Sequence, residues 1–169
     1  STRLIGAVIL AHGDENGLRI PPKIAPIQVV LIPIFRDEEQ RKIIEDYIHS
    51  MIEELKKNGI RIFVDWSDAS PGFKFNEWEL KGIPTRIEVG PRDVESDTVI
   101  IARRDNGEKL SSPRPDLPQR IKDILDQIQS NLYNQAKVFR DSNTHTVNTY
   151  VEFKDIIKNG GFVRCGWDG

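Results

Sequence analysis

The sequence has very few residues that bind metals or form disulfides: one cysteine, Cys165, and three histidines. A single cysteine excludes an intrachain disulfide framework, and the scattered histidines do not have the spacing of a tetrahedral zinc site. No apolar run approaches the roughly 18 residues of a membrane-spanning helix, and no signal-peptide pattern opens the chain. We therefore expect a cytoplasmic protein with no membrane partner and no bound metal.

The chain also lacks a large net charge. Its 24 lysines and arginines and 26 aspartates and glutamates give a formal net charge of -2. This balance argues against a polyanion binder held by bulk charge, so any contact with nucleic acid must depend on a local arrangement of residues. No nucleophilic triad and no phosphate-binding glycine loop is present. At 169 residues, the length suits one ordinary globular domain with a small appendage.

What the sequence does contain is an alternation of strand and helix patterns, which predicts an α/β fold. A strand, an amphipathic helix and a second strand follow one another, and this order favours a right-handed parallel crossover. Asn106-Gly107 is a strong signal for a two-residue hairpin, which would bring Arg103, Arg104 and Lys109 close together. The expected strands are residues 28–34, 61–66, 98–104 and 108–112, and the expected helices are 37–58, 118–139 and 150–158.

The most informative stretch is PGFKFNEWELKGIPTRIEVGPRD, residues 71–93. Ser70 is a suitable N-cap and a proline follows it, so the pattern predicts a helix over 72–81 that stops at Gly82. Phe75 and Glu79 are four residues apart and therefore share one side of that helix. Arg86 alternates with apolar residues in the following strand, which turns it away from the core.

Two interpretations of this stretch remain open from the residues alone. An aromatic ring, a carboxylate and an arginine on one surface suit an unstacked guanine: the carboxylate accepts from N1 and N2, and arginine or lysine donates to O6 and N7. In the simpler interpretation Phe75 and Trp78 are core residues, and Glu79 and Arg86 form a surface ion pair of little energetic weight.

The same run, followed by ARRDNGEK from Ala102 to Lys109, resembles the anticodon-binding domain of prolyl-tRNA synthetases of the archaeal and eukaryotic type, which also occurs in some bacteria. The amino-terminal STRLIGAVILAHGDENGLRIPPKIAPIQVV resembles the junction between the catalytic domain and this domain. The resemblance implies a three-layer α/β/α domain with a mixed, roughly five-stranded sheet. It divides the chain into the end of the catalytic domain and a linker (1–26), the anticodon-binding domain (27–140) and the start of a small carboxy-terminal α/β unit (141–169).

The resemblance also implies roles for individual residues. Phe75 would stack on an anticodon base, Glu79 and Arg86 would read the guanines that proline anticodons share at their second and third letters, and Lys109 would support them. Arg3 matches the ATP-contacting arginine of motif 3 in class II synthetases. The whole enzyme would ligate proline to tRNA(Pro) with ATP and Mg²⁺ and form a homodimer through its catalytic domains, whereas residues 1–169 alone would be inactive.

Zinc binds to cysteines in the carboxy-terminal domain of many family members. Here Asp168 occupies the position where those members carry the first cysteine, so the resemblance implies no zinc, and we expect Cys165 to be a packed thiol. An alternative function is a stand-alone α/β module, derived from the same domain, that binds RNA or another protein. The partial motif 3 at the start of the chain favours a synthetase.

Overall fold

The computed structural model describes residues 2–166. The chain forms two compact units, Ser1–Leu132 and Tyr133–Gly169, and the long helix α5 contributes residues to both. The first unit contains α1 (Arg3–His12), β1 (Val29–Pro33), α2 (Glu38–Lys57), β2 (Ile62–Val64), α3 (Pro71–Leu80), β3 (Thr85–Val89), α4 (Pro91–Glu95), β4 (Thr98–Arg103), β5 (Lys109–Pro113) and most of α5 (Leu117–Ser142).

A five-stranded mixed sheet organises the first unit, in the order β2-β1-β3-β4-β5. β1 is parallel to both β2 and β3, β4 is antiparallel to β3, and β5 is antiparallel to β4. The parallel crossover through α2 and the antiparallel pairing of β4 with β5 are therefore confirmed. The predicted two-residue hairpin is wrong, because the amide of Arg103 bonds to the carbonyl of Glu108 and residues 104–107 form the loop. The short helix α4 was not predicted, because five residues are too few to show a helical period.

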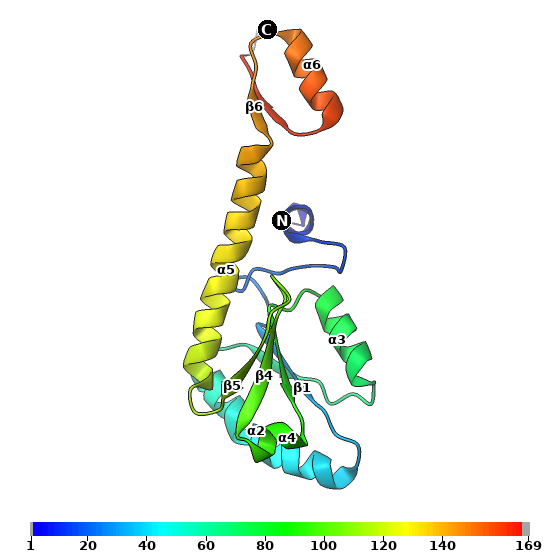
Figure 1. Cartoon of the computed structure of the whole chain (residues 1–169), viewed down its shortest axis with the longest axis vertical. Coiled ribbons are helices and arrows are strands. Elements are labelled where there is room, and N and C mark those ends of the chain that lie inside the picture. Colours follow the sequence, from blue (N-terminus) through cyan, green and yellow to red (C-terminus); the bar gives the residue numbers. More distant parts are fainter. Residues whose placement is uncertain (1, 167–169) are drawn as a thin grey trace. The chain divides into compact units, whose positions relative to one another are not determined.

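Helices cover both faces of the sheet, and Figure 1 shows the sheet between α5 and α3. The larger core lies on the α2 and α5 face, where alternate residues of β1, β3 and β4 meet the apolar stripes of the two helices. A smaller cluster of Val30, Ile32, Trp78 and Ile83 lies under α3 on the opposite face. The expected three-layer architecture is thus confirmed.

The face of the sheet that α3 covers is only partly apolar, and it also carries charged side chains. α3 packs on β1. On β3, Ile87 and Val89 point into the larger core, so Arg86 and Glu88 point to the α3 face, as the alternation predicts. A strip of charged side chains therefore follows α3 along this face.

The expected helix around Phe75 begins and ends for the predicted reasons. The Ser70 hydroxyl accepts a hydrogen bond from the Phe73 amide at 3.4 Å, and Pro71 occupies the first turn. Gly82 follows the helix with φ of 74°, a left-handed conformation in which a side chain would be strained. The helix spans Pro71–Leu80, one residue earlier than predicted.

Residues 13–20 lie against the end of α3. The amide of Leu18 donates to the carbonyl of Leu80 at 3.1 Å, and the amide of Ile20 donates to the carbonyl of Gly82 at 3.0 Å. Farther on, Pro21, Pro22 and Ala25 are buried. The glycine- and proline-rich stretch is therefore held by the first unit through regular backbone hydrogen bonds.

The second unit has its own small α/β arrangement. β6 (Thr144–Thr146) pairs in parallel with β7 (Phe162–Arg164), and α6 (Tyr150–Asn159) connects them. α6 begins at Thr149 with a capping box to Glu152 and matches the predicted helix within one residue. Cys165 is exposed, so the prediction of a packed thiol is wrong; it follows the short strand β7, where few neighbours can cover it. Asp168 lies outside the described residues.

Candidate functional site

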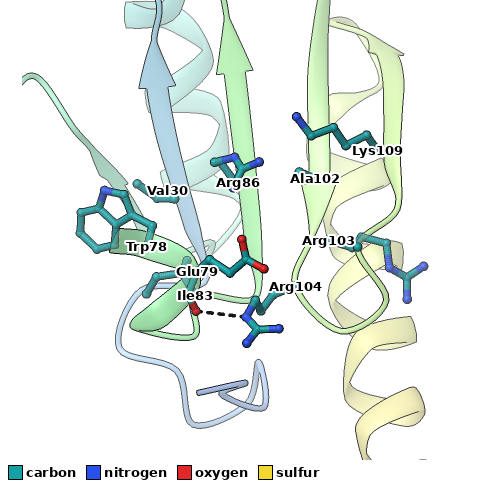
Figure 2. Close-up of a pocket in the computed structure, with 10 residues that line it drawn as sticks. Val30, Trp78, Glu79, Ile83, Arg86, Ala102, Arg103, Arg104 and Lys109 are labelled. Carbon is teal, nitrogen blue, oxygen red and sulfur yellow. Dashed lines mark hydrogen bonds between the residues drawn. The ribbon is translucent and has the colours of Figure 1, made fainter. Parts of the chain in front are cut away.

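A hollow of about 160 Å³ opens on the α3 face of the sheet, next to the carboxyl-terminal half of α3. Figure 2 shows that its walls come from β1, α3, β3, β4 and the hairpin that leads to β5. The lining residues are Val30, Trp78, Glu79, Ile83, Arg86, Ala102, Arg103, Arg104, Gly107 and Lys109. The floor is apolar and the rim is charged, a combination that suits a flat, polar-edged ligand.

Two of the cations that line the hollow, Arg86 and Lys109, belong to a row of paired residues that crosses three strands. Arg86 on β3 pairs with Ala102 on β4, and Ala102 pairs with Lys109 on β5. Residues opposite one another in neighbouring strands share a face, so the two long side chains rise on either side of a methyl group. Ala102 is 7% exposed. Its small side chain leaves the space that the hollow occupies.

Both cations also lie over Phe75, which is half-buried on α3. The guanidinium carbon of Arg86 is 4.1 Å from the ring centroid, and the ammonium nitrogen of Lys109 is 5.3 Å from it. These are cation–π distances. Phe75 therefore joins the two strands to α3 and keeps part of its ring at the surface.

Glu79 faces the hollow from α3, one turn after Phe75 (Figure 2). Its side chain is half-buried, and within residues 2–166 its carboxylate has no hydrogen-bond or ion-pair partner. The surface ion pair between Glu79 and Arg86 in the simpler interpretation is not formed. Arg86 pairs with Glu88 instead, through NH2 at 2.9 Å and Nε at 3.0 Å. A half-buried carboxylate without a partner can accept hydrogen bonds from a ligand.

A buried polar cluster holds α3 on the sheet. The indole nitrogen of Trp78 donates to Asp65 Oδ2 at 2.7 Å, and Lys74 Nζ donates to the backbone carbonyl of Asp65 at 3.0 Å. Burial raises the pKa of Asp65, but hydrogen bonds from Ser67 and Trp78 and the charge of Lys74 outweigh it, so the pKa is lowered from its ordinary value. Trp78 is a core residue, as the simpler interpretation expected.

Arg104 joins the hairpin to both α3 and the amino-terminal segment. Its NH1 and NH2 groups contact the two carboxylate oxygens of Asp14 at 2.9 and 2.6 Å, and its Nε donates to the carbonyl of Glu79 at 3.0 Å. The hydrogen bond from Arg104 lowers the pKa of Asp14, against the smaller opposing effect of burial. The bidentate pair with Asp14 holds the Arg104 guanidinium in place, and its Nε hydrogen bond in turn fixes the backbone of Glu79.

Arg103 does not join the other cations. Its guanidinium points away from Glu79 (Figure 2) and binds Asp105 through Nε at 3.0 Å and NH2 at 2.9 Å, while NH1 donates to Gln127 on α5. Arg103, Arg104 and Lys109 all line the hollow, as the prediction that they lie close together requires, but the Arg103 guanidinium is turned away from it. Successive residues of a strand point to opposite faces, and Arg103 follows Ala102 on the other face of β4.

Four of the predicted site residues thus meet on one surface: Phe75, Glu79, Arg86 and Lys109. Arg3 is exposed at the start of α1 and does not line the hollow. Two residues of the site were missed by sequence reasoning, Glu88 and Ala102. Alternation along β3 places Glu88 on the same face as Arg86, but only the strand register reveals its contact with β5.

Within residues 2–166, no group of three or more histidine, cysteine, aspartate or glutamate side chains could hold a metal ion. None of the helices in this range is long and apolar enough to cross a bilayer.

Comparison with known proteins identifies the domain that carries the hollow. Residues 28–124 match the profile of the family described as anticodon binding domain. Similar curated proteins include those named proline–tRNA ligase from Bacteroides fragilis, Flavobacterium psychrophilum and Rubrobacter xylanophilus, at 44%, 45% and 46% identity. The alignments cover 100% of this chain and 34%, 35% and 36% of the relatives, so the chain spans about a third of their length. The matched segment contains β1 to β5, α3 and every residue of the row beside Phe75, and on this evidence the chain belongs to the anticodon-binding domain family.

Proposed function

We propose that this chain is the anticodon-reading part of a proline–tRNA ligase, and that the hollow beside α3 receives the guanines of the anticodon. The family match and the relatives, which are named proline–tRNA ligase, support the identity of the enzyme. The observation that carries the site is the Glu79 carboxylate, half-buried and without a partner within residues 2–166, on the same hollow as two cations.

The donors and acceptors of the hollow complement the edges of guanine. Glu79 can accept from the N1 and N2 hydrogens, a pattern that guanine alone offers among the four bases. Glu88 occupies the Nε and NH2 side of the Arg86 guanidinium, which leaves the NH1 hydrogens for O6 or N7 of a base. Phe75 supplies an aromatic surface for stacking, and Lys109 adds a second donor above it.

The complete enzyme would activate proline with ATP and Mg²⁺ and transfer it to the tRNA, in the cytoplasm where tRNAs are charged. Arg3 is the residue of this chain that would contact ATP, and its exposed position at the start of α1 is compatible with that role. The complete enzyme would be a homodimer with the catalytic domain beside this one. Residues 1–169 alone would supply tRNA identity and no bond chemistry.

The test is binding of residues 1–169 to two RNA stem-loops, one with a proline anticodon and one with its second and third guanines replaced. We expect the first loop to bind more tightly. Glu79→Gln should weaken its binding by roughly 1 to 3 kcal/mol, because the amide replaces one acceptor with a donor that opposes the guanine hydrogens.

Glu77→Gln is the matched control for this experiment. It makes the same change two residues earlier on α3, where the carboxylate pairs with Lys81 at 2.7 Å and does not line the hollow. Wild-type affinity is expected for this variant. Equal binding of the wild-type chain to both loops would contradict anticodon reading and favour a protein-interaction module.

A further inference from the structure

Glu88 is a buried carboxylate in the middle of the charged strip. Its side chain is 11% exposed, and a single oxygen, Oε1, accepts a hydrogen bond from Arg86 Nε at 3.0 Å and forms ion pairs with Arg86 NH2 at 2.9 Å and Lys109 Nζ at 3.0 Å. Arg86 lies on the same strand, whereas Lys109 lies two strands away on β5. The two cations therefore share one counter-ion.

The shared contact with Glu88 offsets the repulsion between Arg86 and Lys109. Arg86 and Lys109 both approach the ring of Phe75, and nothing larger than the Ala102 methyl group separates them in the strand row. Two positive charges that contact the same carboxylate oxygen lie close enough to repel each other. The Arg86 side chain is 14% exposed and that of Lys109 is 51% exposed, so water screens the repulsion only in part. A carboxylate between them removes the repulsion and allows both to remain over the ring.

Glu88 also determines which N–H groups of Arg86 and Lys109 remain free to bind a ligand. It binds the Nε and NH2 side of the Arg86 fork, which leaves the NH1 hydrogens for another acceptor. It also forms an ion pair with the Lys109 ammonium at 3.0 Å. Without this anchor both long side chains would gain rotamer freedom and could turn toward the phosphates of any RNA.

We infer that Glu88 is a positioning residue that converts Arg86 and Lys109 from general phosphate-binding cations into one base-reading unit. This inference rests on the proposed function, because Glu88 acts through two residues that line the hollow, Arg86 and Lys109. In this role Glu88 lowers the affinity for RNA in general and raises the preference for guanine.

The test is Glu88→Gln in residues 1–169, measured with the two stem-loops at several salt concentrations. We expect the preference for the guanine-containing loop to fall roughly tenfold, as for the loss of one good bidentate contact. The loop without guanines should bind as tightly as to the wild-type chain or more tightly. The slope of log K against log salt should steepen by up to about 1.4, since each newly contacted phosphate adds about 0.7 for single-stranded RNA.

Two further variants separate positioning from folding. Glu88→Asp keeps the charge but is one methylene shorter, so we expect a wild-type salt slope with a partly reduced preference; this variant also carries the test if Glu88→Gln does not fold. Glu53→Gln removes a carboxylate from a surface pair with Lys56 on α2 and should change neither quantity. Thermal unfolding of each variant shows whether the fold is retained.

The outcomes are distinct. A Glu88→Gln chain with wild-type preference and wild-type salt slope overturns the inference and leaves the proposed function standing. A loss of preference that follows the loss of thermal stability, with an unchanged slope, also overturns it, because Glu88 would then be only structural. A wild-type chain without any preference overturns the proposed function, and the inference with it.

Discussion

Phe75 and Trp78 lie about one turn apart on α3 and have opposite environments. Trp78 is 8% exposed and its indole nitrogen is bound to Asp65, so it holds the helix on the sheet. Phe75 is half-buried, and its ring is covered by two cations rather than by aliphatic side chains alone. One aromatic residue therefore serves the fold and the other the surface of the site.

Phe75→Ala should weaken binding of the proline anticodon loop by roughly 1 to 3 kcal/mol, through the loss of stacking. The free energy of unfolding should fall by less than the roughly 3 kcal/mol or more that a fully buried phenylalanine contributes. Phe73→Ala is a suitable control, because Phe73 lies on the same helix and is 59% exposed. Titration and chemical denaturation of both variants check this. Equal losses of binding in the two variants would contradict a specific role for Phe75.

The residues of the site could be predicted from the sequence where they depend on local spacing. Phe75 and Glu79 share a helix face because they are four apart, and Arg86 leaves the core because it alternates with Ile87. Glu88 and Ala102 could not be identified in this way. Their roles depend on the register between β3, β4 and β5, which brings Glu88 to Lys109 across an intervening strand.

At the scale of elements, the end of α3 is clamped between the hairpin and the amino-terminal segment. Leu18 and Ile20 form backbone hydrogen bonds with Leu80 and Gly82, and Arg104 binds the carbonyl of Glu79. A Cβ atom at Gly82 would overlap the backbone carbonyl of Leu18. The clamp thus requires glycine for two reasons, a positive φ and a close backbone contact.

Gly82→Ala should lower the free energy of unfolding by roughly 2 to 4 kcal/mol, because conformational strain and overpacking add. It should also weaken binding of the proline anticodon loop, since the strained backbone leads directly to Glu79. Gly59→Ala is the matched control: Gly59 follows α2 with φ of 78°, and no atom lies within 4 Å of a Cβ built there. Gly59→Ala should lower the free energy of unfolding by only roughly 1 kcal/mol, the cost of placing alanine in the left-handed conformation.

Denaturant unfolding and loop binding of the two glycine variants give the comparison. Equal destabilisation by Gly82→Ala and Gly59→Ala would show that residues 13–20 move away from the new methyl group at little cost and do not hold α3 in place. A large loss of stability for Gly82→Ala with unchanged RNA affinity would show that the contacts at the end of α3 stabilise the fold but do not position Glu79.

The long periodic elements were predictable and the short ones were not. α2 and α5 show apolar residues at helical spacing over many turns, and both lie close to their predicted limits. β6 is absent from the strands expected from the sequence, since Thr-His-Thr has no apolar alternation. It forms a strand because β7 pairs with it, which is a tertiary effect that a local pattern cannot contain.

The charges of the molecule are nearly balanced, and the cations of the hollow are paired with carboxylates. The formal net charge is -2, and each of the four cations lining the hollow has a carboxylate partner. Arg86 and Lys109 share Glu88, Arg103 pairs with Asp105, and Arg104 pairs with Asp14. Phosphates must therefore compete with existing ion pairs, while base edges can still reach the Glu79 carboxylate and the remaining hydrogens of Arg86.

This arrangement predicts a weak dependence of binding on salt and a preference that salt does not remove. Because both site cations are held in ion pairs, the slope of log K against log salt should stay below about 1.4 in magnitude, the value for two phosphate contacts with single-stranded RNA. The ratio of affinities for the two loops should stay constant between about 50 and 200 mM salt, because base contacts release few counterions. Fluorescence anisotropy titrations of both loops across this range measure the slope and the ratio together. A ratio that falls toward one as salt rises would mean that the preference comes from phosphate contacts, and Glu79 would then not be reading a base.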